Sequence, residues 1–364
     1  MKICYFHSDI TLKGGIERVL SILTTKQVQD FNQEVIIVSQ YKTFSLPNFV
    51  FNERVKIVYL TNRMYDGTPG SFHRLLILLQ NRKKIKHFFQ ANKFDIILSQ
   101  AFPNTFLLLY SHISLRNVIA VEHVYYNYYN KWIKKIRILV YKKVKAVVVL
   151  TNNDKKYFTK YLPNVYVIPN PIELSIRYKA PLSNKKIISI GRLEYQKGYD
   201  NLIKIFSNIH KQHPEWVLDI WGEGSWKKRL QIQIKEARLE SCFFLKGITT
   251  EINEKLKEAS IFVVSSRFEG FSMVLVEAMS QGIPCASFDC PNGPSDIITH
   301  RKDGLLIADQ NIAELEKAIL ELIQNKSLRE ELGKQAFKKI ECFDVNLIIK
   351  KWNQLYNCVV NDHE

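Results

Sequence analysis

Short apolar runs rich in β-branched and aromatic residues alternate with longer stretches of helical periodicity along the whole chain. Seven such runs in the first half are predicted strands: Lys2–Phe6, Glu34–Ser39, Val55–Tyr59, Phe94–Leu98, Asn117–Val121, Lys145–Leu150 and Val165–Ile168. Five more follow in the second half: Lys186–Ile190, Trp216–Ile220, Phe243–Leu245, Ile261–Val264 and Ile283–Ser287. Because strands separated by helical stretches form parallel βαβ units, the two series predict an α/β protein with two doubly wound, Rossmann-like sheets.

A proline-containing polar stretch separates the two series of strands. Pro169 and Pro171 exclude helix and favour an extended chain, so the domain boundary is expected within 169–185. We therefore predict an N-terminal domain of residues 1–170 and a C-terminal domain of residues 171–344. The last stretch has helical periodicity, and a helix within 345–364 is able to pack back on the first domain.

Length and composition exclude several classes of protein. With 364 residues the chain is long enough for two domains with separate cores, and 46% apolar with 24% charged residues excludes a disordered or fibrous chain. No apolar run approaches the length of a membrane span, and the start resembles a buried strand rather than a secretory signal, so a cytoplasmic protein is expected. The six cysteines are scattered without zinc-ligand spacing, which indicates reduced thiols and no metal site.

The net charge of +17 is concentrated in the first half of the chain. Residues 1–180 hold 27 Lys and Arg against 10 Asp and Glu, which is the entire excess. Such asymmetry predicts that the first domain faces something anionic: membrane lipid, a phosphate-rich lipid carrier or nucleic acid.

The basic excess is densest in a predicted amphipathic helix over 131–145. At about 100° per residue one face is apolar, formed by Trp132, Ile133, Ile136, Leu139 and Val140. The opposite face is basic, with Lys131, Lys134, Lys142 and Lys145, and Lys135 and Arg137 lie on the flanks. An ordinary surface helix would pack the apolar face on the core, whereas a membrane-surface role is also compatible with this composition. The two interpretations differ in where the basic face points.

In open α/β sheets, ligands bind beyond the carboxyl ends of the strands, and two such domains facing each other would form a cleft that is the default active site. After the first strand, Gly14-Gly15 begin a helix, where backbone N–H groups can approach an anion; a plain tight turn is the alternative. Neither a dinucleotide fingerprint nor a Walker A sequence is present. Glu122-His123 follow the fifth strand; a lone histidine at a strand end is more often structural, and its expected place facing the cleft is what makes His123 a candidate.

The second half carries further candidates at its strand ends. Arg192 and Lys197 share one strand-to-helix loop and would suit a diphosphate, although a solvated loop has the same composition. In the segment 265–284, Glu269 and Gly270 occupy a turn before a helix predicted over Ser272–Gln281, and Glu277 lies inside that helix. The backbone N–H groups of residues 270–274 have no intrahelical partners, which suits phosphate or sugar oxygens.

Together these loops resemble those of the family 4 retaining glycosyltransferases of the GT-B fold, of the bacterial polysaccharide and lipopolysaccharide type. Gly191-Arg-Leu followed by Lys197-Gly198 is similar to the family's donor-phosphate loop, and Glu269 to Glu277 match its E-x7-E motif. Gly14-Gly15, Glu122-His123 and Pro169-Asn170-Pro171 fall where the family has counterparts. The resemblance covers essentially the whole chain, and its specific part is 186–307.

The resemblance implies a role for each matching residue. Arg192 and Lys197 would bind the donor diphosphate and stabilise the departing nucleotide, Glu277 would accept hydrogen bonds from the ribose, and Glu269 would orient the transferred sugar. The rest of the implied donor site consists of Gly270, Phe271, Ser272, Met273 and Val274 beside Glu269, Gly247 and Ile248 at the base, and Gly14, Gly15 and His123 near the anomeric carbon. The implied catalytic residues are Glu269, His123, Arg192 and Lys197.

Breaking a sugar–phosphate bond builds negative charge on the diphosphate, so fixed cations on the leaving group are the main means of catalysis. Arg192, Lys197 and helix N-termini would supply that charge, so no metal or other cofactor is expected, and the chain has no Asp-x-Asp triplet of the kind metal-dependent transferases use. The loop over 290–298 is similar to relatives that use UDP-linked galactose, N-acetylgalactosamine or N-acetylglucosamine. The implied acceptor is a lipid-linked saccharide or polysaccharide on the basic first domain, at the inner face of the membrane.

Three other readings compete with this resemblance. A nucleotide-sugar 2-epimerase shares the two-domain fold, but the segment from Glu269 to Glu277 counts against it. The charge permits a basic nucleic-acid-binding or membrane-binding protein without catalysis, yet no helix-turn-helix, zinc-finger or RNP-like signature is present. A catalytically inactive binding module would need damaged motif positions, and none is seen.

Overall fold

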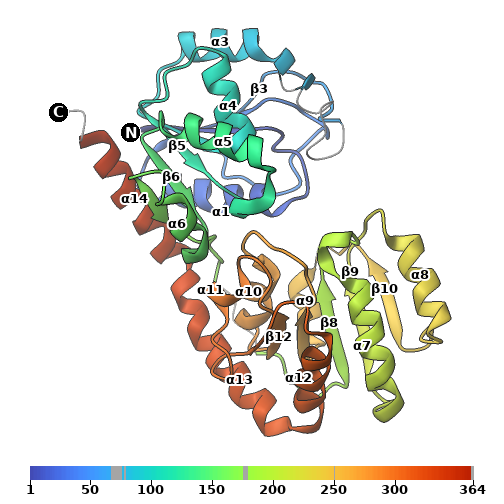
Figure 1. The fold of residues 1–364 in the computed structure, drawn as a ribbon. Helices are drawn as coiled ribbons and strands as arrows, with labels where there is room; N and C mark the ends of the chain where they lie inside the picture. The colour runs from blue at the N-terminus through green and yellow to red at the C-terminus, as the bar shows by residue number, and fades with distance from the viewer. Residues whose placement is uncertain (67–75, 78, 175–178, 250, 362–364) are drawn as a thin grey trace. The chain divides into compact units, whose positions relative to one another are not determined.

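The computed structural model of the chain describes residues 1–66, 76–77, 79–174, 179–249 and 251–361. The chain divides into two compact units, with colours running from blue to red along the sequence in Figure 1. Unit 1 consists of Met1–Pro171 together with Val345–Glu364, and unit 2 of Ile172–Asp344. The first crossing between the units thus lies inside the stretch 169–185 that the prolines indicated; residues 175–178 of that stretch lie outside the described residues.

Unit 1 is built on a sheet in which every neighbouring pair of strands is parallel. Its strands in spatial order are β3 (Lys56–Tyr59), β2 (Glu34–Ser39), β1 (Lys2–His7), β4 (Ile96–Gln100), β5 (Val118–Val121), β6 (Ala146–Val149) and β7 (Val165–Val167). All seven strands expected from the apolar runs are present. The order reverses between β1 and β4, which makes their carboxyl ends the switch point of a doubly wound sheet.

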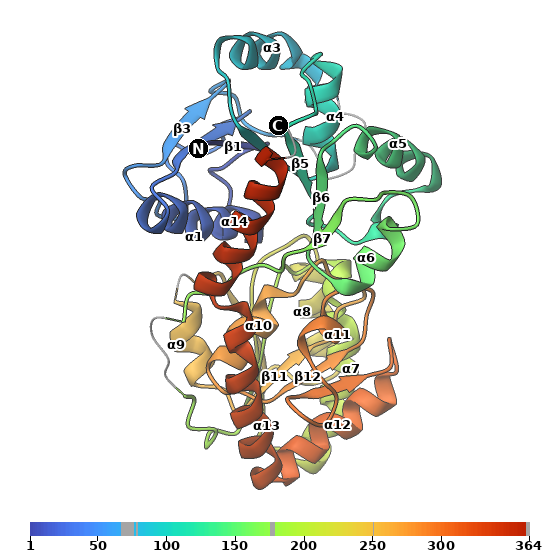
Figure 2. The ribbon, with the colours of Figure 1, turned by 90° about the vertical axis from the view of Figure 1, so that its left-hand side faces the viewer.

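Helices cover both faces of the unit 1 sheet. They are α1 (Gly15–Asp30), α3 (Arg82–Ala91), α4 (Phe102–Tyr110), α5 (Lys131–Tyr141), α6 (Asn152–Phe158) and α14 (Val345–Asn361), with a 3₁₀ turn η1 (Tyr126–Tyr128). The C-terminal helix α14 packs beside α1 (Figures 1 and 2). Tyr5 on β1 donates to Gln27 at 2.9 Å, and Gln27 in turn donates to the Tyr356 hydroxyl at 2.8 Å, so sheet, α1 and α14 are joined by one buried chain of hydrogen bonds.

Unit 2 repeats the same architecture with six strands. Their spatial order is β10 (Phe243–Gly247), β9 (Val217–Trp221), β8 (Lys186–Ile190), β11 (Ile261–Val264), β12 (Cys285–Phe288) and β13 (Leu305–Ile307), all parallel. The five predicted strands are present, whereas β13 was not predicted. Its three residues are too short a run to stand out in the sequence, and only pairing with β12 makes them a strand.

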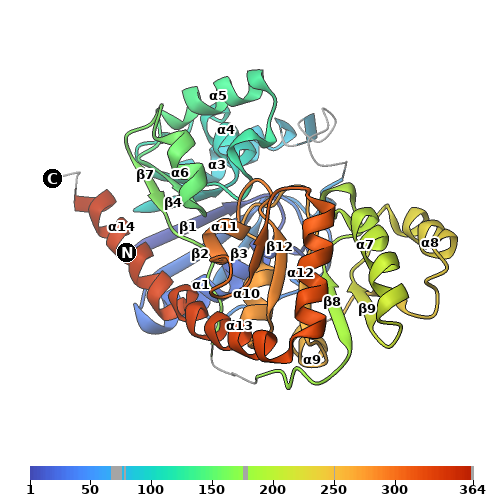
Figure 3. The same ribbon diagram turned by 60° about the horizontal axis from the view of Figure 1, so that its bottom comes forward.

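The helices of unit 2 also cover both faces of its sheet. They are α7 (Tyr199–Gln212), α8 (Lys227–Glu236), α9 (Ile252–Lys257), α10 (Met273–Ser280), α11 (Pro294–Ile297), α12 (Ile312–Gln324) and α13 (Lys326–Lys339), with 3₁₀ turns η2 (Tyr195–Lys197) and η3 (Ile340–Phe343). Helices α7 and α12 pack side by side (Figures 1 and 3), and α10 packs on β11, β12 and α13. No helix in the described parts of either unit is long and apolar enough to cross a membrane.

The predicted apolar face of the basic helix packs on the core only in part, through Ile133 and Val140. In α5 the side chains of Trp132 and Leu139 are 75% and 62% exposed, while Ile138 and Val140 are buried together with Arg137. Arg137, placed on a flank by the periodicity, has no exposed surface because Glu122 and three aromatic rings surround it. A buried ion pair thus sets the rotation of α5, which a count of apolar residues does not reveal.

Candidate functional site

The richest cluster of candidate residues follows the two strands at the switch point of unit 2. Strand β8 lies beside β11, and the loops that leave their carboxyl ends are 191–198 and 265–272. In sheets of this order, neighbouring strands whose connections run to opposite sides leave a crevice between the loops that follow them. The topology therefore brings Arg192, Lys197 and Glu269 to one end of one sheet.

The closest contact in this cluster joins Lys197 and Glu269. Lys197 Nζ lies 2.7 Å from Glu269 Oε1, and the two side chains are 14% and 6% exposed. Ser266 Oγ donates to the same oxygen at 2.6 Å. A hydrogen bond between charged groups is shorter and stronger than a neutral one. The structure thus holds the Glu269 carboxylate from two sides and leaves its orientation fixed.

Two glycines allow Lys197 to take this position. A Cβ atom on Gly191 would lie 2.7 Å from Lys197 Cε and 2.9 Å from the Tyr199 hydroxyl, so any side chain there displaces Lys197. Gly198 has φ +64°, in the left-handed region, and a Cβ atom there would overlap the carbonyl oxygen of Ser265. The glycines of this loop are therefore required by packing as well as by backbone conformation.

A set of hydrogen bonds ties the two loops together. The backbone N–H of Arg267 donates to Gln196 O at 2.7 Å, and Gln196 Nε2 donates to Phe268 O at 2.9 Å. The Arg267 guanidinium binds both carboxylate oxygens of Asp200, at 2.8 and 2.9 Å. Burial alone would raise the pKa of Asp200, but the hydrogen bonds and charge of Arg267 outweigh it and lower that pKa. This bidentate pair, which the sequence did not reveal, anchors the start of α7 to the loop that carries Glu269.

Arg192 occupies the outer part of the same loop. Its side chain is exposed, and its Nη2 atom donates to Gln196 Oε1 at 3.3 Å. An exposed guanidinium in one weak hydrogen bond can turn toward an arriving anion, whereas Lys197 is already held in place. The two cations predicted to act together are therefore on one loop but in different environments.

The loop ends in an unusual backbone at the N-terminus of α10. Ser272, the N-cap, has φ +51° and ψ +63°, a left-handed conformation that costs energy for a residue with a side chain. The Ser272 hydroxyl is buried and makes no hydrogen bond. Gly293, with φ +99°, approaches the Phe271 backbone so closely that a Cβ atom would lie 3.1 Å from its carbonyl carbon. Neighbouring loops thus fix the turn of residues 270–272, whose N–H groups precede the helix.

The remaining donor-site candidates of unit 2 lie further along this edge. Glu277 is 2% exposed and lies at the start of the second turn of α10. Gly247 ends β10 with φ +79°, and Gly222 N–H donates to its carbonyl oxygen at 2.8 Å. Ile248 beside it is 62% exposed. Met273 and Val274 form the first turn of α10, where the N–H groups lack intrahelical partners.

In unit 1, Gly14 and Gly15 differ in their surroundings. A Cβ atom on Gly14 would overlap the Glu17 carboxylate, whereas one on Gly15 would meet nothing within 4 Å. Glu17 Oε1 lies 2.8 Å from His7 Nε2, and both side chains are buried. Burial alone would raise the pKa of Glu17, but His7 outweighs it and lowers that pKa, so the carboxylate is ionised. Gly14 is thus required by the packing of Glu17, and the open side of the turn is at Gly15.

His123 completes this cluster from the end of β5. Its Nε2 atom lies 2.8 Å from Gln100 Oε1 on the neighbouring strand β4, so the Nε2–H tautomer satisfies the amide oxygen. The pKa of His123 is lowered to about 3, mainly by burial and in smaller part by His7, while Glu17 opposes the shift. His123 is therefore neutral near pH 7.

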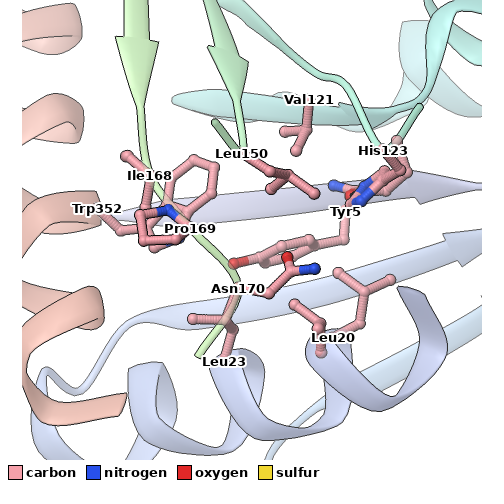
Figure 4. A pocket seen from close by; sticks show the side chains of 12 residues that line it. Tyr5, Leu20, Leu23, Val121, His123, Leu150, Ile168, Pro169, Asn170 and Trp352 are labelled. Carbon is pink, nitrogen blue, oxygen red and sulfur yellow. Dashed lines mark hydrogen bonds between the residues drawn. The ribbon is translucent and has the colours of Figure 1, made fainter. Parts of the chain in front are cut away.

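The cavity behind His123 is small. Figure 4 shows it among Tyr5, Val121, His123, Asn170 and Trp352, with the Tyr5 ring extending across it. Its volume is about 10 Å³, the space of one water molecule. A sugar does not fit there, so any substrate must approach His123 from another side.

Sequence reasoning missed His7, Glu17, Gln100, Ser266 and Arg267. His7 and Gln100 are the last residues of β1 and β4, so the rule that singled out the residues after each strand would have found them if extended by one position. Within the described part of the chain, no group of three or more His, Cys, Asp and Glu side chains could hold a metal ion.

Comparisons with known proteins identify both halves of the chain. The family model of glycosyl transferases group 1 matches residues 173–339, and that of glycosyltransferase family 4 matches residues 13–176. The amylovoran biosynthesis glycosyltransferase AmsD of Erwinia amylovora is 30% identical, over 98% of this chain and 99% of its own. A Campylobacter jejuni α-1,4-N-acetyl-D-galactosaminyltransferase, named for an undecaprenol-linked acceptor, is 22% identical over 99% of both chains.

Among solved structures, Staphylococcus aureus TarM in complex with fondaparinux, α-GlcNAc-glycerol and UDP superposes with a TM-score of 0.79. It is 19% identical to this chain, and the match covers 98% of this chain and 99% of TarM. At that identity the likeness shows the fold, and it confirms the GT-B architecture expected from the motifs.

Proposed function

Because the chain belongs to the family 4 glycosyltransferases of the GT-B fold, we propose that it transfers a hexose or N-acetylhexosamine from a UDP-sugar to a lipid-linked saccharide or polysaccharide. The transfer retains the anomeric configuration and needs no metal ion. The observation that carries the proposal is the Lys197–Glu269 pair at the switch point of unit 2, 2.7 Å apart and nearly buried.

Lys197 is suited to the leaving group. An ammonium has three hydrogen-bond donors, and the contact with Glu269 uses one of them, so others can reach diphosphate oxygens. Arg192 on the same loop adds a guanidinium that binds phosphate through two N–H groups. As the sugar–phosphate bond breaks, these fixed cations and the N–H groups at the start of α10 stabilise the charge that develops on the diphosphate.

The two glutamates take different parts of the donor. Glu269, held by Lys197 and Ser266, accepts hydrogen bonds from hydroxyls of the transferred sugar, and the N–H groups of Gly270, Phe271 and Ser272 lie in the same turn. Glu277 accepts from the ribose, and Gly247 and Ile248 border the base. Each contact is charge-assisted or made by backbone, which suits polar sugar and nucleotide groups.

Unit 1 contributes Gly14, Gly15 and His123 to the proposed reaction. Neutral His123 presents hydrogen-bonding nitrogen rather than a cation to a sugar hydroxyl. The carboxylate beside this turn, Glu17, is buried and held by His7, so a displacement on the same face of the sugar is proposed rather than a covalent glycosyl intermediate.

The named relatives support the choice of donor and acceptor. TarM binds UDP, and the Campylobacter enzyme is named for an N-acetylgalactosamine transfer to an undecaprenol-linked saccharide. AmsD is named for biosynthesis of the polysaccharide amylovoran. A cell-surface glycan assembled on a lipid at the inner face of the membrane fits these names and the basic first half of the chain.

The direct test is an assay of UDP release from UDP-galactose, UDP-N-acetylgalactosamine, UDP-N-acetylglucosamine and UDP-glucose, with and without EDTA, on undecaprenol-linked saccharides. One UDP-sugar is expected to give acceptor-dependent, EDTA-insensitive release and an α-linked product by NMR. Release that needs an added divalent ion, or a β-linked product, would contradict the mechanism. Conversion of the UDP-sugar to its 2-epimer without an acceptor would identify an epimerase instead.

A further inference from the structure

Helix α5 presents a row of large apolar side chains to solvent. Trp132, Ile136 and Leu139 are 75%, 45% and 62% exposed. Their spacing of four and three residues puts them within an arc of roughly 60° on the helix surface. These three residues, called the α5 stripe below, lie opposite the buried side chains of Arg137, Ile138 and Tyr141.

The rotation of α5 is fixed by its buried side. Arg137 Nη2 donates to Tyr126 O at 2.6 Å, and its guanidinium stacks 4.8 Å from the centre of the Phe158 ring. Tyr141 donates to Glu122 Oε1 at 2.6 Å, and the same carboxylate oxygen lies 3.4 Å from Arg137 Nη1. Turning the α5 stripe inward would break this ion pair, and an unpaired buried charge is strongly destabilising.

Unneutralised positive charge surrounds the α5 stripe. Lys131, Lys135, Lys142 and Lys143 are exposed, and none of them forms an ion pair within the described residues. Lys135 Nζ lies 5.2 Å from the Trp132 ring centre. Between residues 96 and 153 the only acidic residue is Glu122, which is buried.

The helices next to α5 carry no acidic residues, and α3 carries further lysines. Helices α3, α4 and α5 follow one another in contact along one face of the unit 1 sheet (Figures 2 and 3). None of the three contains Asp or Glu, and α3 adds exposed Lys83, Lys84 and Lys86. An apolar row flanked by lysines, on a helix without acidic residues, is the pattern of a helix that lies in a membrane interface.

We propose that α5 lies in the interface of an anionic lipid membrane. The α5 stripe enters the boundary between headgroups and acyl chains, and the lysines around it contact lipid phosphates. A nucleic acid would match the charge but would leave Leu139 and Ile136 in water, so charge and apolar stripe together favour lipid. The geometry of this inference depends on α5 alone. Its biological purpose, access to a lipid-linked acceptor, rests on the proposed function.

Vesicle sedimentation tests the proposal with the full chain. We expect binding to vesicles of 70% phosphatidylcholine and 30% phosphatidylglycerol, and little binding to pure phosphatidylcholine. Replacing Lys135, Lys142 and Lys143 by Gln should weaken binding by about fivefold per lysine. Trp132→Ser with Leu139→Ser should weaken it at least tenfold, and should do so equally at low and at high salt, because the lost contact is apolar.

Matched controls come from exposed positions of unit 2. Lys326, Lys334 and Lys338 on α13 are exposed, and Ile232 on α8 is 59% exposed. Replacing the three lysines by Gln, or Ile232 by Ser, should leave vesicle binding unchanged. An equal loss in these controls would mean that net charge or general surface hydrophobicity, and not α5, drives binding, and would overturn the proposal.

A second readout reports on Trp132 itself. Of the five tryptophans, Trp216 and Trp352 are buried and Trp132 is 75% exposed, so a blue shift of emission with anionic vesicles should vanish in Trp132→Phe. An unchanged shift in Trp132→Phe would overturn the proposal. So would a dimer, seen by light scattering, that the α5 stripe variant abolishes, or binding to random DNA that the same variant weakens. The α5 variants should keep the thermal shift caused by UDP, so a failure of membrane binding and a failure of the proposed donor are separable.

Discussion

Lys197 and Glu269, 72 positions apart in the sequence, meet at 2.7 Å in the loops that follow neighbouring strands β8 and β11. The cation proposed for the leaving group and the carboxylate proposed for the transferred sugar therefore hold each other in place before a donor arrives. Such preorganised charges need no rearrangement during the reaction, which is the usual source of electrostatic catalysis.

The first prediction separates the roles of the two glutamates. Glu269→Ala should abolish sugar transfer and leave the affinity for UDP largely unchanged, because Glu269 is assigned to the sugar. Glu277→Ala should weaken UDP itself by about 10- to 100-fold, since a hydrogen bond to a charged group contributes about 1.5–3 kcal/mol. Calorimetric titration with UDP measures both, and an equal loss of UDP affinity in the two variants would refute this division of roles.

The second prediction uses the two glycines beside Lys197 as a matched pair. Gly191→Ala places a methyl group 2.7 Å from Lys197 Cε, in the flexible part of a long side chain. Because Lys197 can move aside, the melting temperature should change little. Turnover should fall, since Lys197 no longer holds Glu269. Gly198→Ala meets the backbone carbonyl of Ser265 at a positive φ and should cost more than about 1 kcal/mol of stability. Thermal unfolding and UDP-release rates compare the two; similar melting temperatures for both variants would contradict this reading of the loop.

The sequence predicted the two sheets well because parallel strands buried on both faces are near-continuous apolar runs. It predicted that Arg192, Lys197 and Glu269 follow strands of one sheet, and residues in such positions gather at one edge of that sheet. It failed in part for α5, where burial of Arg137 against Glu122 rotates the helix and leaves Trp132, Ile136 and Leu139 of the predicted apolar face exposed. It also missed the Arg267–Asp200 pair, because nothing in a linear sequence reports which charges will meet across a loop.

The third prediction concerns the glycines of unit 1. Gly14→Ala should disturb the His7–Glu17 pair and lower the melting temperature, because the new methyl group overlaps the Glu17 carboxylate. Gly15→Ala should keep the melting temperature or raise it slightly, since the methyl group meets nothing and alanine favours helix. If the open side of this turn admits substrate, Gly15→Ala nevertheless lowers the rate of transfer. Full activity in Gly15→Ala would remove this glycine from the site.

The fourth prediction is a pH dependence of stability caused by His123. Its pKa is about 3 in the folded protein against an ordinary 6.5, so the unfolded chain binds more protons between these values. The stabilising effect is complete above pH 6.5 and is lost as the pH falls toward 3, by at most about 1.4 kcal/mol per pH unit.

Urea unfolding at pH 7 and pH 5 tests this dependence, with His123→Asn as the control that cannot titrate. The wild type should lose up to about 2 kcal/mol more than the variant over this interval. The interval stays above 4.5, the ordinary pKa of a glutamate. The lowered pKa of Glu17 therefore changes the stability only in more acidic solution. Parallel curves for the two proteins would show that His123 is not shielded from protons.

The most direct test of the central claim is thermal unfolding with UDP, GDP, ADP and CMP, each with and without EDTA. A ligand at about 100 times its dissociation constant adds roughly 2.7 kcal/mol of stability, enough to raise the melting temperature by several degrees. The account predicts a shift with UDP alone that EDTA does not change and that Glu277→Ala reduces. A shift with GDP alone would replace the proposed donor, and no shift with any of the four nucleotides would contradict a nucleotide-sugar site at the Lys197–Glu269 pair.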